Sequence, residues 1–211
     1  MSGRRAPLGC RLTGLALLAG CAGAPDAPWR ELFDGVSLAG WRPTPFGGEG
    51  EVVVRDGALH LGFGSPLTGV TWQGPPPEGA YEFEITAARV AGTDFFCGLT
   101  FPVGDAWLTL VLGGWGGSVC GLSSLDGRDA ARNETRTLRA FANGVDHTAR
   151  VTVTADEVVV ALDEAPLLRA GLAGRALSLR PEVELSRPLG VAAFATEARI
   201  TRVRWRPLHA P

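Results

Sequence analysis

The sequence predicts an all-β protein: an antiparallel β-sandwich of jelly-roll type with about a dozen strands. Short segments alternate between apolar and polar residues, and turn signals separate them at short spacing. The 29 glycines and 15 prolines provide many turns, and 45% of the residues are hydrophobic. No segment has the periodicity of an amphipathic helix, and only 127–134 (GRDAARNE) could form a helical turn. The 211 residues fit one domain.

The first elements are a hairpin and a long strand. In residues 52–63, Asp56-Gly57 lies between two apolar segments, which is a strong hairpin signal. A short strand is expected at 69–73 and a long one at 80–90. The long strand carries Tyr81, Phe83 and Ile85 on one face and Glu82, Glu84 and Thr86 on the other. This alternation predicts one buried face and one solvated face.

The remaining elements continue the pattern. We expect four strands between residues 94 and 141, at 94–101, 107–112, 118–125 and 135–141. Two hairpins in series follow in 149–168, turning at Asp156-Glu157 and at Asp163-Glu164. Residues 189–208 give two closing strands. Ile200, Val203 and Trp205 form the apolar side of the last one, and Arg199, Arg202, Arg204 and Arg206 keep its other side in water.

The N-terminus has the layout of an export signal. Arg4, Arg5 and Arg11 precede an apolar segment that is too short to span a bilayer, and small residues follow. The end of this segment, LAGC at 18–21, resembles the bacterial lipobox, whose cysteine is lipidated. We therefore expect a lipoprotein signal peptide at 1–20, lipidated Cys21 with a flexible tether at 21–28, and the folded domain at 29–208.

This layout predicts an exported protein anchored in the lipid bilayer through Cys21. Ala22 follows the cysteine, where an Asp would favour the inner membrane, so the periplasmic face of the outer membrane is expected. An ordinary signal peptide that contains a cysteine is the alternative. All 20 basic residues are arginine, and loss of the leader leaves 17 of them against 22 acidic residues. With no basic patch, nucleic acid is not an expected partner.

Cys97 and Cys120 remain after removal of the leader and are expected on neighbouring strands. In an oxidising compartment they could form a disulfide. Two buried free thiols are the alternative, because strand alternation does not show that the two Cβ atoms meet.

Several segments resemble the 3-keto-disaccharide hydrolase-like family. The opening WRELFDGVSLAGWR (29–42) and the closing GVAAFATEARITRVRWRPL (190–208) are the most specific, and the likeness spans 29–208. The resemblance implies a concanavalin-like jelly roll and a carbohydrate substrate outside the cytoplasm. It also implies cleavage of glycosides whose C3 hydroxyl is oxidised to a ketone. The ketone acidifies the C2 proton, so a base can remove it and expel the C1 substituent. A metal ion could stabilise the enolate.

Trp115 is the first candidate site residue, because two glycines flank it on each side. It could stack on a sugar ring, or it could cover one end of the sandwich. The segment 124–134 (SLDGRDAARNE) could supply a base, an enolate-stabilising arginine or oxygens for a divalent cation such as calcium. Its members are Asp126 and Glu134 as candidate catalytic residues, and Arg128, Asp129 and Arg132 as candidate substrate ligands. A solvated loop is the alternative.

Asp94, at a strand start, is a further candidate ligand, and His60, within a strand, is a candidate base. Each has a plain alternative: a turn residue for Asp94 and a solvated side chain for His60. The sequence departs from the family because Asp126 has no carboxylate in the strand before it, which puts catalysis in doubt. Two functions therefore stay open: an enzyme acting on oxidised sugars, and a non-catalytic, membrane-tethered glycan-binding or interaction module.

Overall fold

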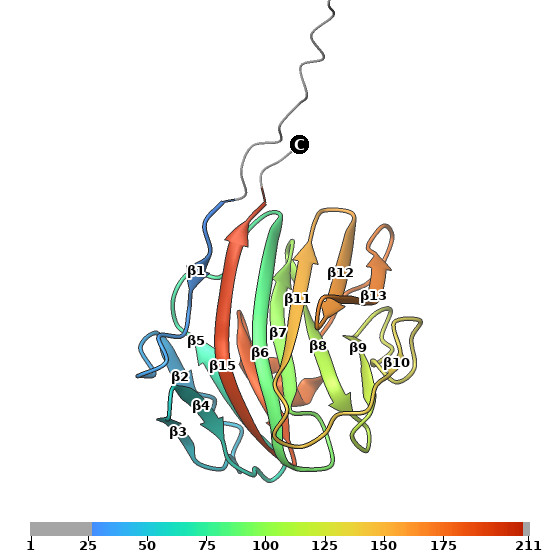
Figure 1. The fold of residues 1–211 in the computed structure, drawn as a ribbon. Helices are drawn as coiled ribbons and strands as arrows, with labels where there is room; N and C mark the ends of the chain where they lie inside the picture. Colours follow the sequence, from blue (N-terminus) through green and yellow to red (C-terminus); the bar gives the residue numbers. More distant parts are fainter. Residues whose placement is uncertain (1–26, 209–211) are drawn as a thin grey trace, which may run out of the picture.

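The computed structural model describes residues 27–208 and is a sandwich of two antiparallel β-sheets (Figure 1). Sheet A contains β1 (Arg30–Glu31), β3 (Val52–Arg55), β4 (Ala58–Leu61), β6 (Tyr81–Gly92), β11 (His147–Val153), β12 (Glu157–Leu162), β13 (Ala165–Gly171) and β15 (Thr196–Pro207). Sheet B contains β2 (Trp41–Pro43), β5 (Leu67–Trp72), β7 (Cys97–Val103), β8 (Ala106–Gly114), β9 (Val119–Ser123), β10 (Thr137–Leu138) and β14 (Gly190–Phe194). The predicted fold class is confirmed, with 15 strands in place of about a dozen.

The predicted hairpins form where the turn residues indicated. Asp56 and Gly57 both have positive φ and connect β3 to β4. The strand pairs β11–β12 and β12–β13 are the expected hairpins in series. Asp163 and Glu164 take positive φ at the second turn, as a tight turn that matches the twist of the flanking strands requires.

The core lies between the two sheets and is built from the apolar face of each strand. Tyr81, Phe83 and Ile85 of β6 are buried, as predicted. The register of β15 shifts between Ile200 and Arg202, so this bulge keeps the apolar residues on both sides of it facing the core. The face of β6 that was expected to be solvated differs at one position. Glu84 is buried under arginine side chains.

Residues 127–134, the segment that could have formed a helical turn, form a series of tight turns. The described residues contain instead one 3-10 helix, η1 (Pro181–Ser186). Pro181 fits the first position, since its fixed φ suits a helix and its missing N–H would have no partner there. Val183 packs with Leu67 and Ala192 on the face of sheet B that points away from the core. No helix in residues 27–208 has the length and apolarity needed to cross a membrane.

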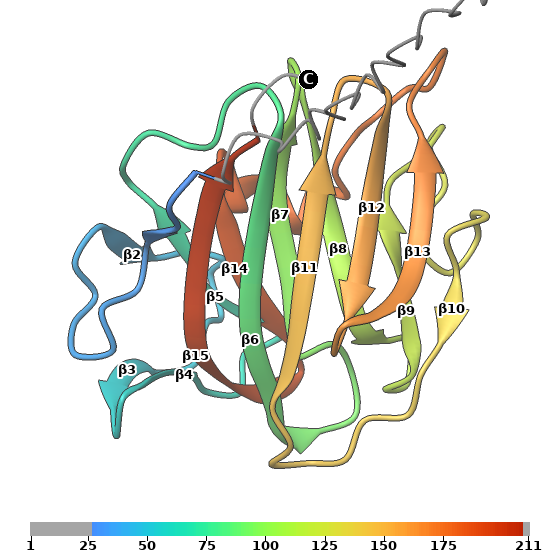
Figure 2. The same ribbon diagram turned by 45° about the horizontal axis from the view of Figure 1, so that its top comes forward.

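The two longest strands, β6 and β15, run the length of the sandwich in opposite directions. Tyr81 pairs with Pro207 at one end, and Gly92 pairs with Thr196 at the other. The N-terminal β1 lies at the first end, where Arg30 pairs with Trp205. Figure 1 shows β1 beside the end of β15, and Figure 2 shows that end of β15 away from the β8–β9 turn. The predicted signal peptide, Cys21 and most of the tether lie outside the described residues.

The two cysteines of the domain are buried free thiols. The expectation that they lie on neighbouring strands is wrong, because β8 lies between β7 and β9. Two strand spacings separate their backbones by about 10 Å, which exceeds the reach of a disulfide. Burial, and to a smaller extent the neighbouring Cys120, raises the pKa of the Cys97 thiol to about 12. Burial also raises the pKa of Cys120.

We predict that neither Cys97 nor Cys120 reacts with a maleimide in the native protein at pH 8, because each thiol is buried and protonated. Both should react after unfolding in guanidinium. Peptide mapping by mass spectrometry checks both statements. A disulfide-linked Cys97–Cys120 peptide from the native protein would contradict this description of the core.

Candidate functional site

A hollow of about 200 Å³ lies on the outer face of sheet B, near the β8–β9 turn. On β8, Leu108, Leu110 and Leu112 face the core, so Thr109 and Val111 face the hollow. Its apolar lining consists of Leu67, Phe95, Val111, Trp115, Val183 and Phe194, and its polar lining of Asp94, Thr109, Ser123, Arg180 and Glu182. A concave, mostly apolar surface with a few convergent polar groups is the usual form of a small-ligand site.

Trp115 stands at the rim of this hollow. Its side chain remains 41% exposed, although most large apolar residues of the domain are buried. It occupies the turn between β8 and β9 with a φ of 47°, which a tryptophan rarely adopts. Strain of this kind persists only where surrounding contacts hold the backbone in place.

The first of these contacts comes from Arg89 on β6. Its guanidinium is buried and donates to the carbonyl oxygens of Gly117 at 2.8 Å, Gly113 at 3.3 Å and Phe141 at 3.5 Å. Burial lowers the pKa of Arg89, while Asp94 opposes that shift. A Cβ at Gly113 would lie 2.5 Å from the Nη2 atom of Arg89. Gly113 and Gly117, on either side of Trp115, therefore let the guanidinium reach the backbone.

The second contact comes from Asp94. Its carboxylate accepts hydrogen bonds from the backbone N–H groups of Trp115 at 3.2 Å, Gly116 at 3.3 Å and Phe95 at 2.8 Å. Its own N–H donates to Thr196 Oγ1 at 3.1 Å. Asp94 therefore lies at the hollow, as a candidate ligand should, but its carboxylate is already engaged with the tryptophan turn. We call Arg89 and Asp94 the loop clamp.

Arg180 and Glu182 form the opposite wall, next to η1. Arg180 donates to Asp129 Oδ2 at 3.0 Å and to Glu182 Oε1 at 2.6 Å. The Asp129 side chain is only 12% exposed, so it positions Arg180 from behind the hollow. The hydrogen bond to Arg180 holds the pKa of Glu182 below its usual range, against the effect of burial. The same bond is the main cause of the raised pKa of Arg180.

The other members of the acidic loop do not line the hollow. Asp126 and Glu134 both pair with Arg175, Asp126 at 3.0 Å. The N–H of Ala176, and then Arg175, lower the pKa of Asp126. These contacts tie residues 126–134 to the segment before η1. Arg128 and Arg132 are exposed, and neither is among the described residues that line the hollow.

His60 is not part of this site. It lies on β4 of sheet A with its side chain on the outer face, because Leu59 and Leu61 face the core. Its Nδ1 atom is 3.5 Å from Arg55, and burial, followed by the charge of Arg55, lowers its pKa. β4 belongs to sheet A, whereas the Trp115 turn connects two strands of sheet B, so His60 does not line the hollow.

The predicted calcium site has no preformed cluster in residues 27–208, where no three His, Cys, Asp or Glu side chains are grouped to hold a metal ion. Asp126, Asp129 and Glu134 are each paired with an arginine.

No family model and no curated protein sequence matches this chain. Its fold is similar to that of several solved carbohydrate-active proteins. A non-specific endo-β-1,3(4)-glucanase from family GH16 aligns over 87% of this chain and 93% of its own, with 13% identity and a TM-score of 0.55. The Crh5 transglycosylase in complex with NAG covers 89% and 88%, with 12% identity and a TM-score of 0.60.

A binding module is similar as well. The carbohydrate-binding module CBM66 from Bacillus subtilis covers 79% of this chain and 95% of its own, with 9% identity and a TM-score of 0.53. The chain therefore has a jelly-roll β-sandwich fold, which it shares with these solved structures.

We predict that Gly113→Ala destabilises the tryptophan turn more than Gly116→Ala. Both glycines have positive φ, so each substitution strains the backbone by about 1–2 kcal/mol. A Cβ at Gly116 meets nothing within 4 Å, whereas at Gly113 it displaces the Arg89 guanidinium. Loss of those buried hydrogen bonds adds about 1–3 kcal/mol. Urea unfolding of the two variants gives the comparison, and equal losses would contradict the role of Arg89.

Proposed function

We propose that this protein is an extracytoplasmic, lipid-anchored carbohydrate-binding module whose ligand lies in the hollow beside Trp115. The exposed indole, held by the loop clamp at the rim of an apolar hollow, is the observation that carries the proposal. A flat aromatic face can cover the C–H face of a sugar ring. A rigid platform also avoids an ordering cost when the ligand binds.

The polar lining fits a hydroxylated ligand. Arg180 and Glu182 offer donors and acceptors at one wall, and Thr109 and Ser123 offer hydroxyls from the floor. A few fixed polar groups of this kind orient a sugar, while Phe95 and Phe194 exclude water from its apolar face.

The state of the carboxylates favours binding over turnover. A general base works best when its pKa lies near the operating pH. Asp94 accepts three backbone N–H groups, and Glu182 has a lowered pKa because of Arg180. Glu182 is therefore poorly suited to remove a proton from carbon, and the Asp94 carboxylate is engaged with the tryptophan turn.

Cleavage of 3-keto-glycosides is the second candidate function, and the observation behind it is that a carboxylate, Glu182, and a guanidinium, Arg180, both line the hollow. In this scheme Glu182 would remove the C2 proton, and Arg180 would stabilise the enolate oxygen at C3. The electron pair would expel the C1 substituent as an alcohol, and water would then add to the unsaturated product.

The placement of the hollow suits an anchored binding protein. β1 lies at one end of the sandwich. The Trp115 turn follows β8, which runs to the opposite end (Figure 1). An anchor at Cys21, eight residues before Trp29, would therefore leave the hollow directed away from the membrane and accessible to glycans.

We predict that Trp115→Ala lowers the affinity for neutral β-glucan oligosaccharides by about tenfold, since an aromatic contact contributes about 0.5–1.5 kcal/mol beyond the area it buries and about 1.4 kcal/mol corresponds to tenfold in affinity. Isothermal titration calorimetry on the full chain in non-ionic detergent measures this change. Phe63→Ala is the matched control, because Phe63 is 53% exposed but does not line the hollow. Equal affinities in wild type and Trp115→Ala would refute the site.

Incubation with 3-keto and ordinary glycosides separates the two functions. A binding module releases no aglycone from either group. Release from the 3-keto substrates alone, abolished in Glu182→Gln, would replace the binding proposal with the second candidate. Asp126→Asn is the control, because Asp126 pairs with Arg175 outside the hollow.

A further inference from the structure

The outer face of sheet A carries a second, more polar hollow of about 630 Å³ between β6, β11, β12 and β15. It lies on the sheet opposite the Trp115 hollow, and neither proposed function uses it. We propose that this hollow binds the carboxylate of an acidic sugar residue, such as a uronic acid within a glycan.

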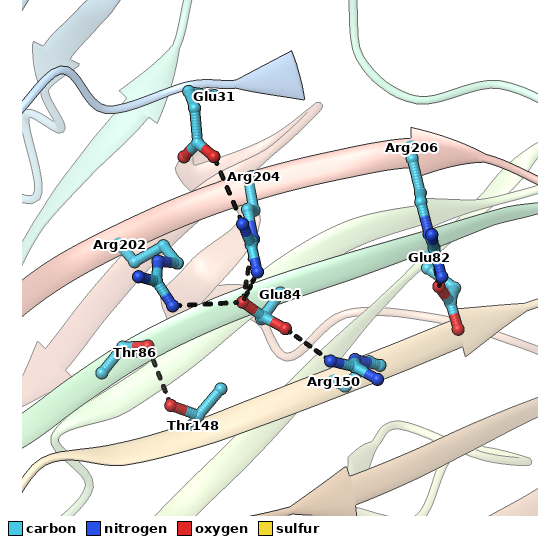
Figure 3. Close-up of polar contacts among 9 residues, drawn as sticks. All are labelled: Glu31, Glu82, Glu84, Thr86, Thr148, Arg150, Arg202, Arg204 and Arg206. Carbon is cyan, nitrogen blue, oxygen red and sulfur yellow. Dashed lines mark hydrogen bonds and ion pairs between the residues drawn. The ribbon is translucent and has the colours of Figure 1, made fainter. Parts of the chain in front are cut away.

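The base of this hollow is a fixed cluster of charges around Glu84 (Figure 3). The Glu84 side chain is only 3% exposed. Its Oε1 accepts from Arg204 Nε at 2.8 Å and Nη2 at 2.6 Å, and its Oε2 accepts from Arg150 at 2.9 Å. Burial raises the pKa of Glu84, but the bonds to Arg150 and Arg204 outweigh burial and hold the pKa below its ordinary value. The carboxylate is therefore ionised and keeps two guanidinium groups in place.

Three arginines surround the single carboxylate of Glu84, so more guanidinium groups are present than its charge requires. Arg204 alone donates two hydrogen bonds to it, yet Arg202 also lies 3.6 Å away, and Arg150 approaches from β11. Figure 3 shows Arg202 and Arg150 on opposite sides of Glu84. Their side chains are 50% and 47% exposed. Each guanidinium has five N–H donors, so both retain donors that a second carboxylate can accept from in the paired geometry arginine favours.

The opposite wall limits the kind of anion. Asp163 and Glu164 line it, but Asp163 is already engaged with His147 at 2.8 Å and with the N–H of Thr148 at 2.9 Å. Glu164 therefore presents a carboxylate to the hollow. Asp163 and Glu164 repel a ligand with many negative charges. A ligand with one carboxylate among hydroxyls can place the carboxylate against the arginines and its hydroxyls against the two acidic residues. This mixed lining favours a uronic acid over a sulfated chain or a nucleic acid.

Calorimetry of the full chain in non-ionic detergent, with tri-galacturonate and its methyl ester as probes, tests the proposal. Arg202→Gln and Arg150→Gln should each weaken tri-galacturonate binding about tenfold or more. The methyl ester should bind the wild-type protein as weakly as it binds these variants. Added salt should weaken the binding of tri-galacturonate but not that of its methyl ester. Arg202→Gln should fold normally, because Glu84 keeps its bonds to Arg150 and Arg204.

Two controls make the result specific. Arg199→Gln removes an arginine from the same face of β15, but Arg199 pairs with Asp146 and does not line this hollow, so binding should stay within twofold. Trp115→Ala should also retain tri-galacturonate binding, which separates this proposal from the one for the first hollow. The inference is overturned by unchanged binding in both Arg202→Gln and Arg150→Gln, by equal affinity for the methyl ester, or by equally strong competition from inorganic sulfate.

Discussion

The site depends on two charged groups, Arg89 and Asp94, that hold one strained turn from opposite sides. Arg89 binds the carbonyl oxygens of the turn, and Asp94 binds its N–H groups. A backbone that satisfies both partners has its polar groups paired within the protein, and this offsets the strain of a tryptophan with positive φ. The fold supplies both groups from β6 and the residues just after it, and β6 pairs along its length with β15.

The outer faces of the two sheets are covered by different kinds of group. Sheet B covers most of its outer face with η1 and the loop at 126–136, and the space left over is the Trp115 hollow. Sheet A leaves its outer face polar, where Glu84 and its arginines replace an apolar cover. One sheet therefore presents an aromatic platform and the other a set of guanidinium groups, which suit different parts of a glycan.

Local patterns in the sequence were sufficient for the fold. The turn residues Asp56-Gly57 and the alternation in β6 depend on neighbours in the chain, and both predictions are confirmed. Trp115 could also be found from the sequence, since glycines on both sides of a tryptophan are unusual locally, whereas Asp94 was a candidate only through its place at a strand start. The structure brings them to one hollow, with Asp94 as the residue that positions the turn.

Contacts between distant segments could not be predicted. Arg180 and Glu182 lie in a stretch without periodicity, and only the packing of η1 on sheet B brings them to the hollow. Asp126 and Glu134 looked available because their partner, Arg175, lies more than forty residues away in the chain. His60 alternates correctly along β4, but alternation does not show which sheet the strand joins.

Hydrogen exchange at two backbone amides tests the central claim most directly. If Asp94 holds the turn, the N–H groups of Trp115 and Gly116 exchange slowly in the native protein, although both residues are exposed. In Asp94→Ala both amides should exchange at rates near those of an open loop, while the amide of Val151 in the core stays protected. Fast exchange of the two amides in the native protein, or the same slow exchange in Asp94→Ala, would contradict the account.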